Sequence, residues 1–200
     1  MVYGSTMEIH KTLRAYTQGK LKTSTGDLLP IDEHGQFYGG DIRAIENMGL
    51  TTLQVLFLRE HNRLCDEIIK ADPSLSDEDI FTIARNMVIG FIQKISFEEY
   101  LPNLFGRKHF DKFIGSYKGY NSSADPTIFT EFSSTAYRIG HPYVTHTYKA
   151  VDNNNITVEE INLLDLLVSN PKTLSYFRVN TILKGMAFTL AKERTLDYVD

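Results

Sequence analysis

One histidine stands in a sequence context that could bind a metal centre. His141 ends an amphipathic segment, with Gly140 before it and Pro142 after it. Because glycine has no side chain, a flat group could approach the backbone closely at that point. A haem iron takes a neutral imidazole held on a rigid element, and His141 could supply one. A lone histidine is more often a packing or surface residue, so its position alone leaves both interpretations open.

A second candidate is a pair of opposite charges near the start of the chain. Arg43 and Glu46 are three residues apart and would share one face of a helix. In a functional site, the cation could polarise a bound oxidant with the carboxylate beside it. The alternative is a surface ion pair, which contributes roughly a few tenths of a kcal/mol.

The block from Arg59 to Arg63 interrupts an otherwise apolar helical pattern with five polar residues. Charged residues are rarely buried without partners, so the block is either a buried polar network or a solvated helix face. His141 and His146 are five residues apart, not the four that place two imidazoles on one helical face. The sequence also lacks a glycine-rich phosphate loop, a serine nucleophile elbow and an HExxH motif. These absences exclude nucleotide-binding and zinc-hydrolase interpretations.

Composition narrows the classes of protein further. The chain has 200 residues, 42% hydrophobic and 12% aromatic, with a formal net charge of −4. This balance is typical of a soluble globular protein and excludes both a disordered chain and a basic nucleic-acid-binding protein. The single cysteine, Cys65, excludes an internal disulfide framework. No apolar run approaches the roughly 20 residues that span a bilayer, and the N-terminal sequence MVYGSTMEIHK lacks a signal-peptide pattern.

Helices are the elements expected to position these residues in the first half of the chain. A helix is expected from about Met7 to Tyr16, followed by an irregular surface excursion over residues 19–41. Apolar residues at helical spacing from Leu50 predict a long helix that ends near Asp72. Ser76 and Asp79 form a capping box. The helix that they open is apolar on nearly all sides, which predicts a central, buried position, and Pro102 and Gly106 should close it.

Helical signals continue in the second half. Asp125 and Pro126 form an N-cap and first-turn proline, which predict a helix as far as His141. Thr157 and Glu160 form a capping-box signature that predicts another helix, and a last helix is expected from about Thr173 to Arg194. No repeat and no convincing strand is evident. The sequence therefore predicts a mainly α fold of several packed helices joined by long irregular loops.

Several long segments, in this order, resemble the animal haem peroxidase family. They are GGDIRAIENMGL with LQVLFLREHNRLCDEI directly after it, FTIARNMVIGFIQKISFEEYLPNLFG, and GYNSSADPTIFTEFSSTAYRIGHP. The resemblance covers nearly the whole chain and is greatest to the peroxinectin-like and bacterial members. It implies that the fold is the central part of the animal haem peroxidase fold.

The resemblance implies roles for individual residues. In the RxGH motif the histidine is the proximal ligand of the haem iron, which is His141, and the arginine near a haem propionate is Arg138. In the GDxR motif the arginine that assists peroxide cleavage is Arg43. Glu46 matches the glutamate that can form an ester with haem in mammalian members. Asn47 stands where those members have a methionine that can also bond to haem, so that second link should be absent.

The implied cofactor is haem b, and the implied reaction is the reduction of hydrogen peroxide followed by oxidation of small electron donors. The distal histidine and the calcium-binding segment of the family would lie upstream of these residues. The asparagine that bonds to the proximal imidazole would lie downstream. Residues 1–200 are therefore expected to form a single partial haem peroxidase domain, catalytically incomplete as this chain, with the calcium site absent. Complete members are often secreted, but the sequence itself leaves the compartment open.

Two alternatives remain. Fatty-acid dioxygenases and cyclooxygenases of the same superfamily have a radical-forming tyrosine three residues before the proximal histidine. Here that position is Arg138, and Tyr137 is one residue further away, which favours the peroxidase. The other alternative is a non-catalytic haem-binding or interaction remnant that self-associates through exposed apolar surface. No partner nucleic acid or membrane span is expected under any of these interpretations.

Overall fold

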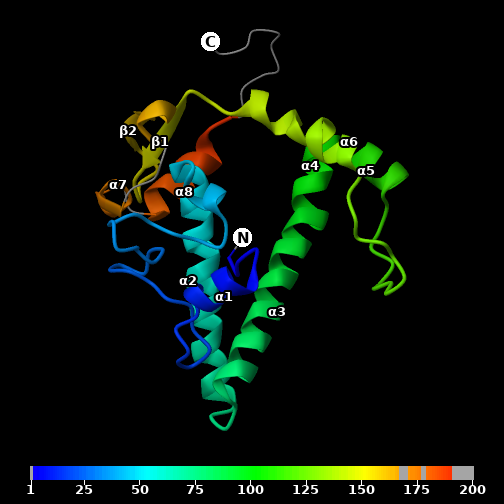
Figure 1. Ribbon diagram of the computed structural model, residues 1–200. Coiled ribbons are helices and arrows are strands. Elements are labelled where there is room, and N and C mark those ends of the chain that lie inside the picture. Colours follow the sequence, from blue (N-terminus) through cyan, green and yellow to red (C-terminus); the bar gives the residue numbers. More distant parts are fainter. Residues whose placement is uncertain (1, 167–170, 177–178, 191–200) are drawn as a thin grey trace. The chain divides into compact units, whose positions relative to one another are not determined.

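The structure, a computed structural model, describes residues 2–166, 171–176 and 179–190. The chain divides into two compact units: residues 1–85 with 144–193, and residues 86–143 with 194–200. The described residues are mainly helical, as predicted, with one small two-stranded sheet (Figure 1). None of the helices in the described ranges is long and apolar enough to cross a membrane.

The first unit consists of short helices, one long helix and a hairpin. In chain order its elements are α1 (Met7–Leu13), the 3₁₀-helix η1 (Ile42–Ile45), α2 (Met48–Ala71), β1 (Thr147–Val151), β2 (Thr157–Asn162), the 3₁₀-helix η4 (Leu163–Leu166), α7 (Pro171–Tyr176) and α8 (Val179–Phe188). α8 packs against both α2 and the hairpin (Figure 1). α3 (Asp77–Ile95) begins in this unit and continues into the second.

The prediction of a long helix from Leu50 to Asp72 is confirmed by α2. The helix begins two residues earlier than the apolar pattern, because the Asn47 side chain caps it by accepting a hydrogen bond from the Leu50 amide at 3.0 Å. It ends at Ala71, directly before Asp72 and Pro73. One face of the helix supplies the buried residues Met48, Thr51, Thr52, Val55, Leu58, His61, Leu64 and Cys65.

The predicted surface excursion over residues 19–41 proved to be part of the core. Leu21, Leu28, Leu29 and Phe37 are each at most 5% exposed and belong to the main hydrophobic cluster. Turns at left-handed glycines fold the segment back on itself, so that apolar side chains return repeatedly to the interior. The prediction of irregular backbone was right, but the prediction of a surface position was wrong. The many turn-forming residues indicated a surface loop, although the apolar residues between them are buried.

Part of the polar block on α2 forms a network, part-buried at Asn62 and exposed at Arg59, that satisfies the backbone of this irregular segment. The Asn62 side chain accepts from the Leu21 amide at 2.9 Å and donates to the Leu21 carbonyl at 3.0 Å. Arg59 donates to the carbonyls of Gly26 and Asp27 at 2.8 and 2.9 Å. A loop without strand partners needs such donors, because unpaired buried carbonyls are costly.

His61 is the fully buried member of this network. Its Nε2 lies 2.9 Å from the Gly19 carbonyl and its Nδ1 lies 2.9 Å from the Tyr3 hydroxyl. Since a carbonyl only accepts, Nε2 carries the proton and Nδ1 accepts from Tyr3. Burial lowers the pKa of His61, and the nearby Arg14 guanidinium lowers it further. The imidazole is therefore held neutral between two segments that precede α2.

Lowering the pH should weaken the first unit through His61. The folded pKa is depressed below the ordinary value near 6.5, so the unfolded chain binds the extra proton more readily. Stability from this group is complete above pH ~6.5. It is lost as the pH falls below that value, by at most about 1.4 kcal/mol per pH unit. Urea unfolding between pH 7.5 and 5 should show this slope in the wild type and lack it in His61→Gln.

His34 provides a matched control, because its side chain is 77% exposed. His34→Gln should keep the acid slope of the wild type. An unchanged slope in His61→Gln would contradict a neutral, buried imidazole at position 61.

The second half of the first unit contains a β-hairpin that was not predicted. β1 and β2 are antiparallel, with Tyr148 opposite Ile161. The Asp152 side chain accepts from the amides of Asn154 and Ile156 at 2.8 and 2.9 Å and closes the turn. The predicted helix opened by Thr157 and Glu160 is therefore wrong. An aspartate-centred turn and the β-branched residues beside it favoured the strand over the capping signal.

The predicted last helix, from Thr173 to Arg194, is divided in the structure. α7 starts two residues before Thr173, and α8 ends at Phe188. The expected end at Arg194 lies outside the described residues. Gly185 is what allows α8 to lie against β1. A Cβ atom there would overlap the Lys149 carbonyl oxygen and lie 2.6 Å from its carbon.

Gly185→Ala should destabilise the first unit by about 3 kcal/mol or more, because the methyl group would push α8 away from β1. Gly90→Ala is the matched control, since Gly90 is also helical and a Cβ atom there meets nothing within 4 Å. That control should gain about 0.5–1 kcal/mol from helix propensity. Thermal unfolding of the two variants measures both effects. Equal stability of the two would contradict the packing of α8 on the hairpin.

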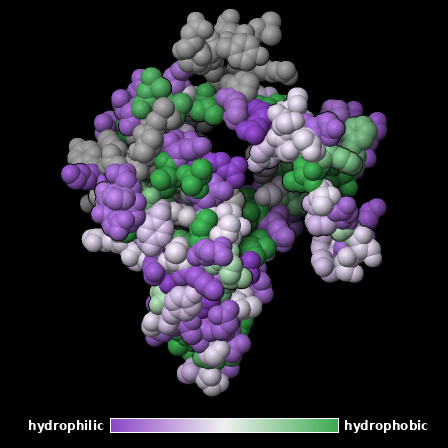
Figure 2. All heavy atoms as spheres, in the orientation of Figure 1, coloured by the Kyte–Doolittle hydropathy of each residue, from purple (hydrophilic) through white to green (hydrophobic). Residues whose placement is uncertain are grey.

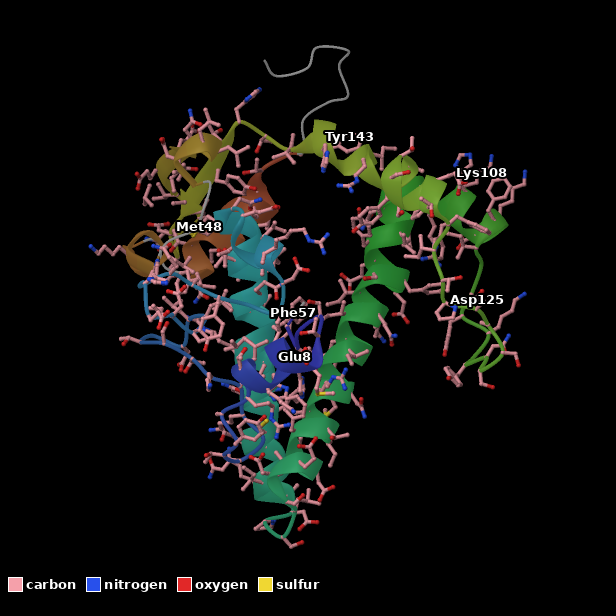
Figure 3. The ribbon with its side chains drawn as sticks, in the orientation of Figure 1. Glu8, Met48, Phe57, Lys108, Asp125 and Tyr143 are labelled. Atoms are coloured by element: carbon pink, nitrogen blue, oxygen red, sulfur yellow. The ribbon has the colours of Figure 1, made fainter. Side chains whose placement is uncertain are left out.

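The second unit is built from the later part of α3 and a series of short helical segments. They are the π-helix η2 (Ser96–Tyr100), α4 (Leu101–Phe105), α5 (Arg107–Phe113), α6 (Thr130–Ser134) and the 3₁₀-helix η3 (Ala136–Tyr143), whose last residue is labelled in Figure 3. The capping box that opens α3 is confirmed, since the Asp79 amide donates to the Ser76 hydroxyl at 3.2 Å. Pro102 does not close the helical run, because it occupies the first turn of α4. At that position the missing N–H of a proline breaks no hydrogen bond within the helix. Gly106, with φ of 77°, ends that run.

Two predictions for this unit are wrong. The α3 face expected to be buried carries exposed apolar side chains, including Met87, Phe91 and Ile95 at 39–43%. Figure 2 shows apolar atoms on the visible surface among hydrophilic ones.

The predicted helix from Pro126 to His141 begins only at Thr130 and changes to 3₁₀ geometry at Ala136. Asp125 instead accepts from the Thr127 amide at 2.9 Å, which forms a turn rather than a helix start.

Candidate functional site

Arg43 and Glu46 lie on a tight 3₁₀ turn, η1, directly before α2. Asp41 begins this turn by accepting from the Arg43 amide at 2.9 Å. The Asp41 carboxylate also binds the Arg43 guanidinium through two bonds, at 2.8 Å to Nε and 2.9 Å to Nη2. The sequence prediction paired Arg43 with Glu46 and did not include Asp41, although the two residues are only two apart.

The two-bond contact changes the acidity of Asp41. Hydrogen bonds from the side chain and the backbone of Arg43 lower the pKa of this carboxyl to about 2. A two-pronged arginine–carboxylate contact also fixes orientation, which a single bond does not. Asp41 therefore keeps its negative charge at any ordinary pH, and it holds the arginine on the turn in one orientation.

The turn is attached to α2 from its other side. The Ala44 side chain is buried, and its carbonyl accepts from the Thr51 hydroxyl at 3.1 Å. Met48, the first residue of α2, is 1% exposed and belongs to the core cluster (Figure 3). The Gly40 carbonyl accepts from the Ser5 amide at 3.0 Å, which joins the N-terminal segment to the start of the turn. The backbone that carries Arg43 and Glu46 is thus fixed at both ends, while both side chains are exposed.

His141 and Arg138 lie together on η3, in the second unit. In a 3₁₀-helix, residues three apart eclipse one another, so these two side chains leave the helix on the same side. Both side chains are exposed, and a Cβ atom at Gly140 would meet nothing within 4 Å. Tyr137 is four residues before His141 and is therefore not eclipsed with it.

These features fit a haem ligand. The described contacts give the His141 ring no hydrogen-bond partner, so its nitrogen is not committed to a structural bond. The open space at Gly140 allows a flat group to approach, and the exposed apolar side chains of Phe132 and Ile139 are nearby in sequence. A haem needs an imidazole ligand with apolar surface around it, and η3 offers an exposed imidazole beside exposed apolar side chains. The pair Arg43 and Glu46 and the pair Arg138 and His141 belong to different units.

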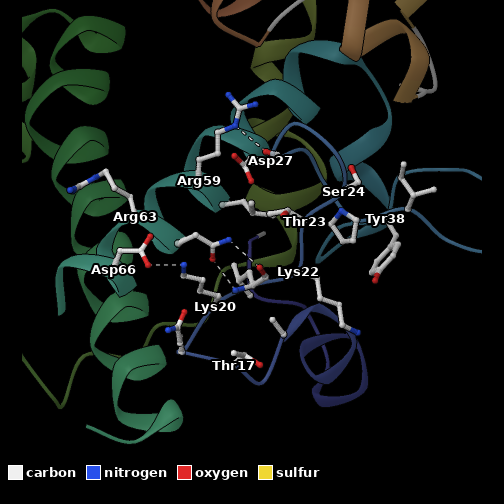
Figure 4. Close-up of a pocket in the computed structure, with 17 residues that line it drawn as sticks. Thr17, Lys20, Lys22, Thr23, Ser24, Asp27, Tyr38, Arg59, Arg63 and Asp66 are labelled. Atoms are coloured by element: carbon white, nitrogen blue, oxygen red, sulfur yellow. Dashed lines mark hydrogen bonds and ion pairs between the residues drawn. The ribbon is translucent and has the colours of Figure 1, made fainter. Parts of the chain in front are cut away.

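A hollow of the first unit is a different feature. An open basin of about 910 Å³ lies between the irregular segment and α2 (Figure 4). Two of its lysine and arginine side chains are in ion pairs: Lys20 with Asp66 at 2.6 Å, and Arg63 with Glu60 at 2.8 Å. Arg59 is held by backbone carbonyls, as described above. None of the four residues predicted for the haem site lines this basin, so it is not the candidate site.

Comparison with known proteins identifies the family. The family model for animal haem peroxidase matches residues 1–200. The chain belongs to this family. A relative of this chain is peroxidase mlt-7 of Caenorhabditis elegans, which is 36% identical over 207 residues, covering 96% of this chain and 28% of that protein. Peroxinectin A of Dictyostelium discoideum is 31% identical, covering 93% of this chain and 35% of that protein.

Solved structures agree with this assignment. Peroxidase A from Dictyostelium discoideum matches with a TM-score of 0.79 and 27% identity, over 96% of this chain and 39% of that one. A fatty acid α-dioxygenase of Arabidopsis thaliana matches with a TM-score of 0.77 and 25% identity, over 95% of this chain and 35% of that one. The fold is therefore that of the animal haem peroxidases, as the sequence predicted. The chain spans about a third of the length of the proteins that it matches.

The Arg43–Asp41 contact can be tested by acid titration. The Asp41 carboxyl should titrate near pH 2, and the NMR signal of the Arg43 Nε–H should follow the same titration. The sign is fixed by the depressed pKa: the contact stabilises the fold above pH ~4 and is lost as the pH falls through the folded value. Asp41→Asn should remove the acid titration of the Nε–H signal. A carboxyl that titrates near its ordinary value would show that Arg43 is not held.

Proposed function

We propose that this chain contributes the proximal ligand and the distal arginine of a haem peroxidase site, with haem b as the cofactor. The family assignment implies haem. The observation that supports the ligand assignment is the exposed His141 imidazole, eclipsed with Arg138 beside an open glycine on η3. His61 is not a competing ligand, because both of its ring nitrogens are bonded in the interior.

When bound, the haem supplies the iron at which hydrogen peroxide is reduced, and the chain's own residues determine how the group is held. His141 would hold the iron through a ring nitrogen. Arg138, on the same side of η3, would pair with a haem propionate. A guanidinium and a carboxylate can form a two-bond contact, which would hold the propionate firmly.

On the distal side the proposal assigns Arg43 to the peroxide. With haem bound, its guanidinium would donate hydrogen bonds to a peroxide oxygen, which gains negative charge during reduction. Such donors act most strongly when they are already oriented, and the Asp41 contact provides that orientation. Small electron donors would supply the electrons that the reduction consumes. These donors, and hydrogen peroxide itself, are proposed as partners of the protein.

Glu46 is proposed as the residue that can form an ester bond with the haem. Its carboxyl is exposed at the end of η1, three residues after Arg43. The second covalent link of mammalian members is not proposed, because Asn47 occupies that position and its side chain caps α2. The Asn47 side chain accepts from the Leu50 amide, so its role is to stabilise the start of α2 and not to bond to haem.

Both compact units are proposed to belong to one haem peroxidase domain, since a single family model covers residues 1–200. The described residues contain no cluster of three or more histidine, cysteine or acidic side chains able to hold a metal ion. Calcium is proposed only for the complete family fold.

The dioxygenase alternative is not preferred. The relatives reported above that match in sequence are named as a peroxidase and a peroxinectin. In addition, no tyrosine lies three residues before His141 on η3, where its side chain would be eclipsed with the imidazole. A non-catalytic remnant that self-associates has one observation in its favour. Large apolar side chains on the second unit are highly exposed, with Phe129 at 83% and Phe113 at 72%. This second candidate would bind haem weakly or not at all.

Haem titration of the purified chain, followed by Soret absorbance, tests the proposed function. The wild type should show saturable uptake of one haem per chain, and His141→Ala should lose the spectral signature of a nitrogen ligand. His109→Ala and His146→Ala are controls that should retain it. Arg138→Ala should weaken uptake about tenfold, since a charged hydrogen bond contributes roughly 1.5–3 kcal/mol.

Uptake that does not depend on His141 would contradict the ligand assignment. Self-association without specific haem uptake, measured by sedimentation, would favour the non-catalytic alternative over the peroxidase.

A further inference from the structure

Two adjacent threonines on the first turns of α2 differ in a single respect. Thr51 and Thr52 are both fully buried, with 0% of each residue exposed. The Thr51 hydroxyl lies 3.1 Å from the carbonyl oxygens of both Ala44 and Asn47, which share its single hydrogen. The Thr52 hydroxyl has no partner among the described residues. A hydroxyl therefore has a structural task at position 51 that it lacks at position 52.

The Ala44 carbonyl links the Thr51 hydroxyl to the candidate site. Ala44 lies between Arg43 and Glu46, in the middle of the 3₁₀ turn η1. Its side chain is 5% exposed, and the bond from Thr51 joins its carbonyl to α2. Because one short turn carries both site residues, a rotation of the Ala44 peptide would redirect Arg43 and Glu46 together.

The anchors of the turn act on different parts of it. Asp41 holds the Arg43 side chain and the first amide of the turn. Asn47 caps α2 and sets where the helix begins. Thr51 alone, among these contacts, reaches the central peptide of the turn. A 3₁₀ turn has weaker internal hydrogen bonds than an α-helix, so an outside donor to its centre contributes strongly to its orientation.

We propose that Thr51 is a positioning residue for the peroxide-facing turn. Its hydroxyl fixes the Ala44 peptide and thereby the directions in which Arg43 and Glu46 leave the backbone. The inference rests on the proposed function for the roles of Arg43 and Glu46. The positioning of the turn itself is a property of the unloaded chain and can be measured without haem.

Three variants separate positioning from packing. Thr51→Val keeps the shape and removes the hydroxyl, Thr51→Ser keeps the hydroxyl and removes a methyl group, and Thr52→Val is the matched control. Amide hydrogen exchange of the unloaded full chain is measured at Ala44 and Glu46, whose amides donate to Asp41 and Arg43 within the turn. The Gly35 amide, which donates to Asp32 in a separate turn, serves as the reference.

Thr51→Val should speed exchange at Ala44 and Glu46 about tenfold or more, since it leaves a buried carbonyl without its donor. Thr51→Ser should restore most of the protection. Thr52→Val should leave these amides unchanged, and exchange at Gly35 should be unchanged in all three variants. Equal exchange in Thr51→Val and Thr52→Val, or failure of the serine to rescue, would overturn the positioning role. If Thr51→Val exchanges faster at Gly35 as well, the hydroxyl supports general stability and the proposal is equally overturned.

A second measurement connects the turn to the cofactor. In the haem-loaded chain, Thr51→Val should weaken binding of a small anion such as fluoride, read by the Soret shift, while haem uptake itself stays within about twofold of the wild type. A haem-loaded Thr51→Val chain with unchanged fluoride affinity would overturn the link between the turn and the site. If the wild-type chain takes up no haem, the proposed function fails, and hydrogen exchange still decides whether Thr51 positions the turn.

Discussion

The first unit depends on one constraint, which is that the irregular backbone of the first 47 residues needs hydrogen-bond partners from outside itself. This stretch has little regular structure, yet it supplies several of the most buried side chains of the core. Its polar backbone groups therefore need donors from elsewhere. α2 provides them through Arg59, His61 and Asn62, which bond to backbone atoms between Gly19 and Asp27. The side chains of one helix thus provide the hydrogen bonds that hold the irregular segment in place. In a sheet, neighbouring backbone strands would provide them.

The same helix governs the candidate site at its other end. The first turn of α2 holds η1 through the Thr51 hydroxyl and begins at the Asn47 cap. Asp41 completes the arrangement by fixing the guanidinium of Arg43. Arg43 and Glu46 therefore leave a backbone that is fixed at both ends, and the guanidinium of Arg43 is itself held by Asp41. Preorganisation of this kind is what electrostatic stabilisation of a developing negative charge requires. α2 accordingly connects the stability of the unit to the chemistry proposed for it.

Sequence patterns predicted the elements whose signals are local, and missed those whose signals depend on packing. The apolar repeat placed α2 closely, although it did not reveal the Asn47 cap, and the Ser76 capping box placed the start of α3. The helix predicted to start at Thr157 is a strand. The Thr-x-x-Glu pattern of a capping box can also occur in a strand that follows an aspartate-centred turn. Of the site, the family resemblance named Arg43, Glu46, Arg138 and His141. It did not name Asp41 or Thr51, since neither the two-bond contact nor the buried hydroxyl is visible until the backbone is folded, although an aspartate two residues before an arginine was a usable signal.

The central claim is that the His141 imidazole binds haem iron, and chemical rescue tests it most directly. His141→Gly would open a space next to Gly140, into which free imidazole can diffuse. The haem-loaded variant should lack a nitrogen-ligand spectrum and regain it, saturably, on addition of imidazole. The His109→Gly variant should show that spectrum without imidazole and should not respond to its addition. A His141→Gly chain that retains a histidine-ligated spectrum in the absence of imidazole would contradict the account.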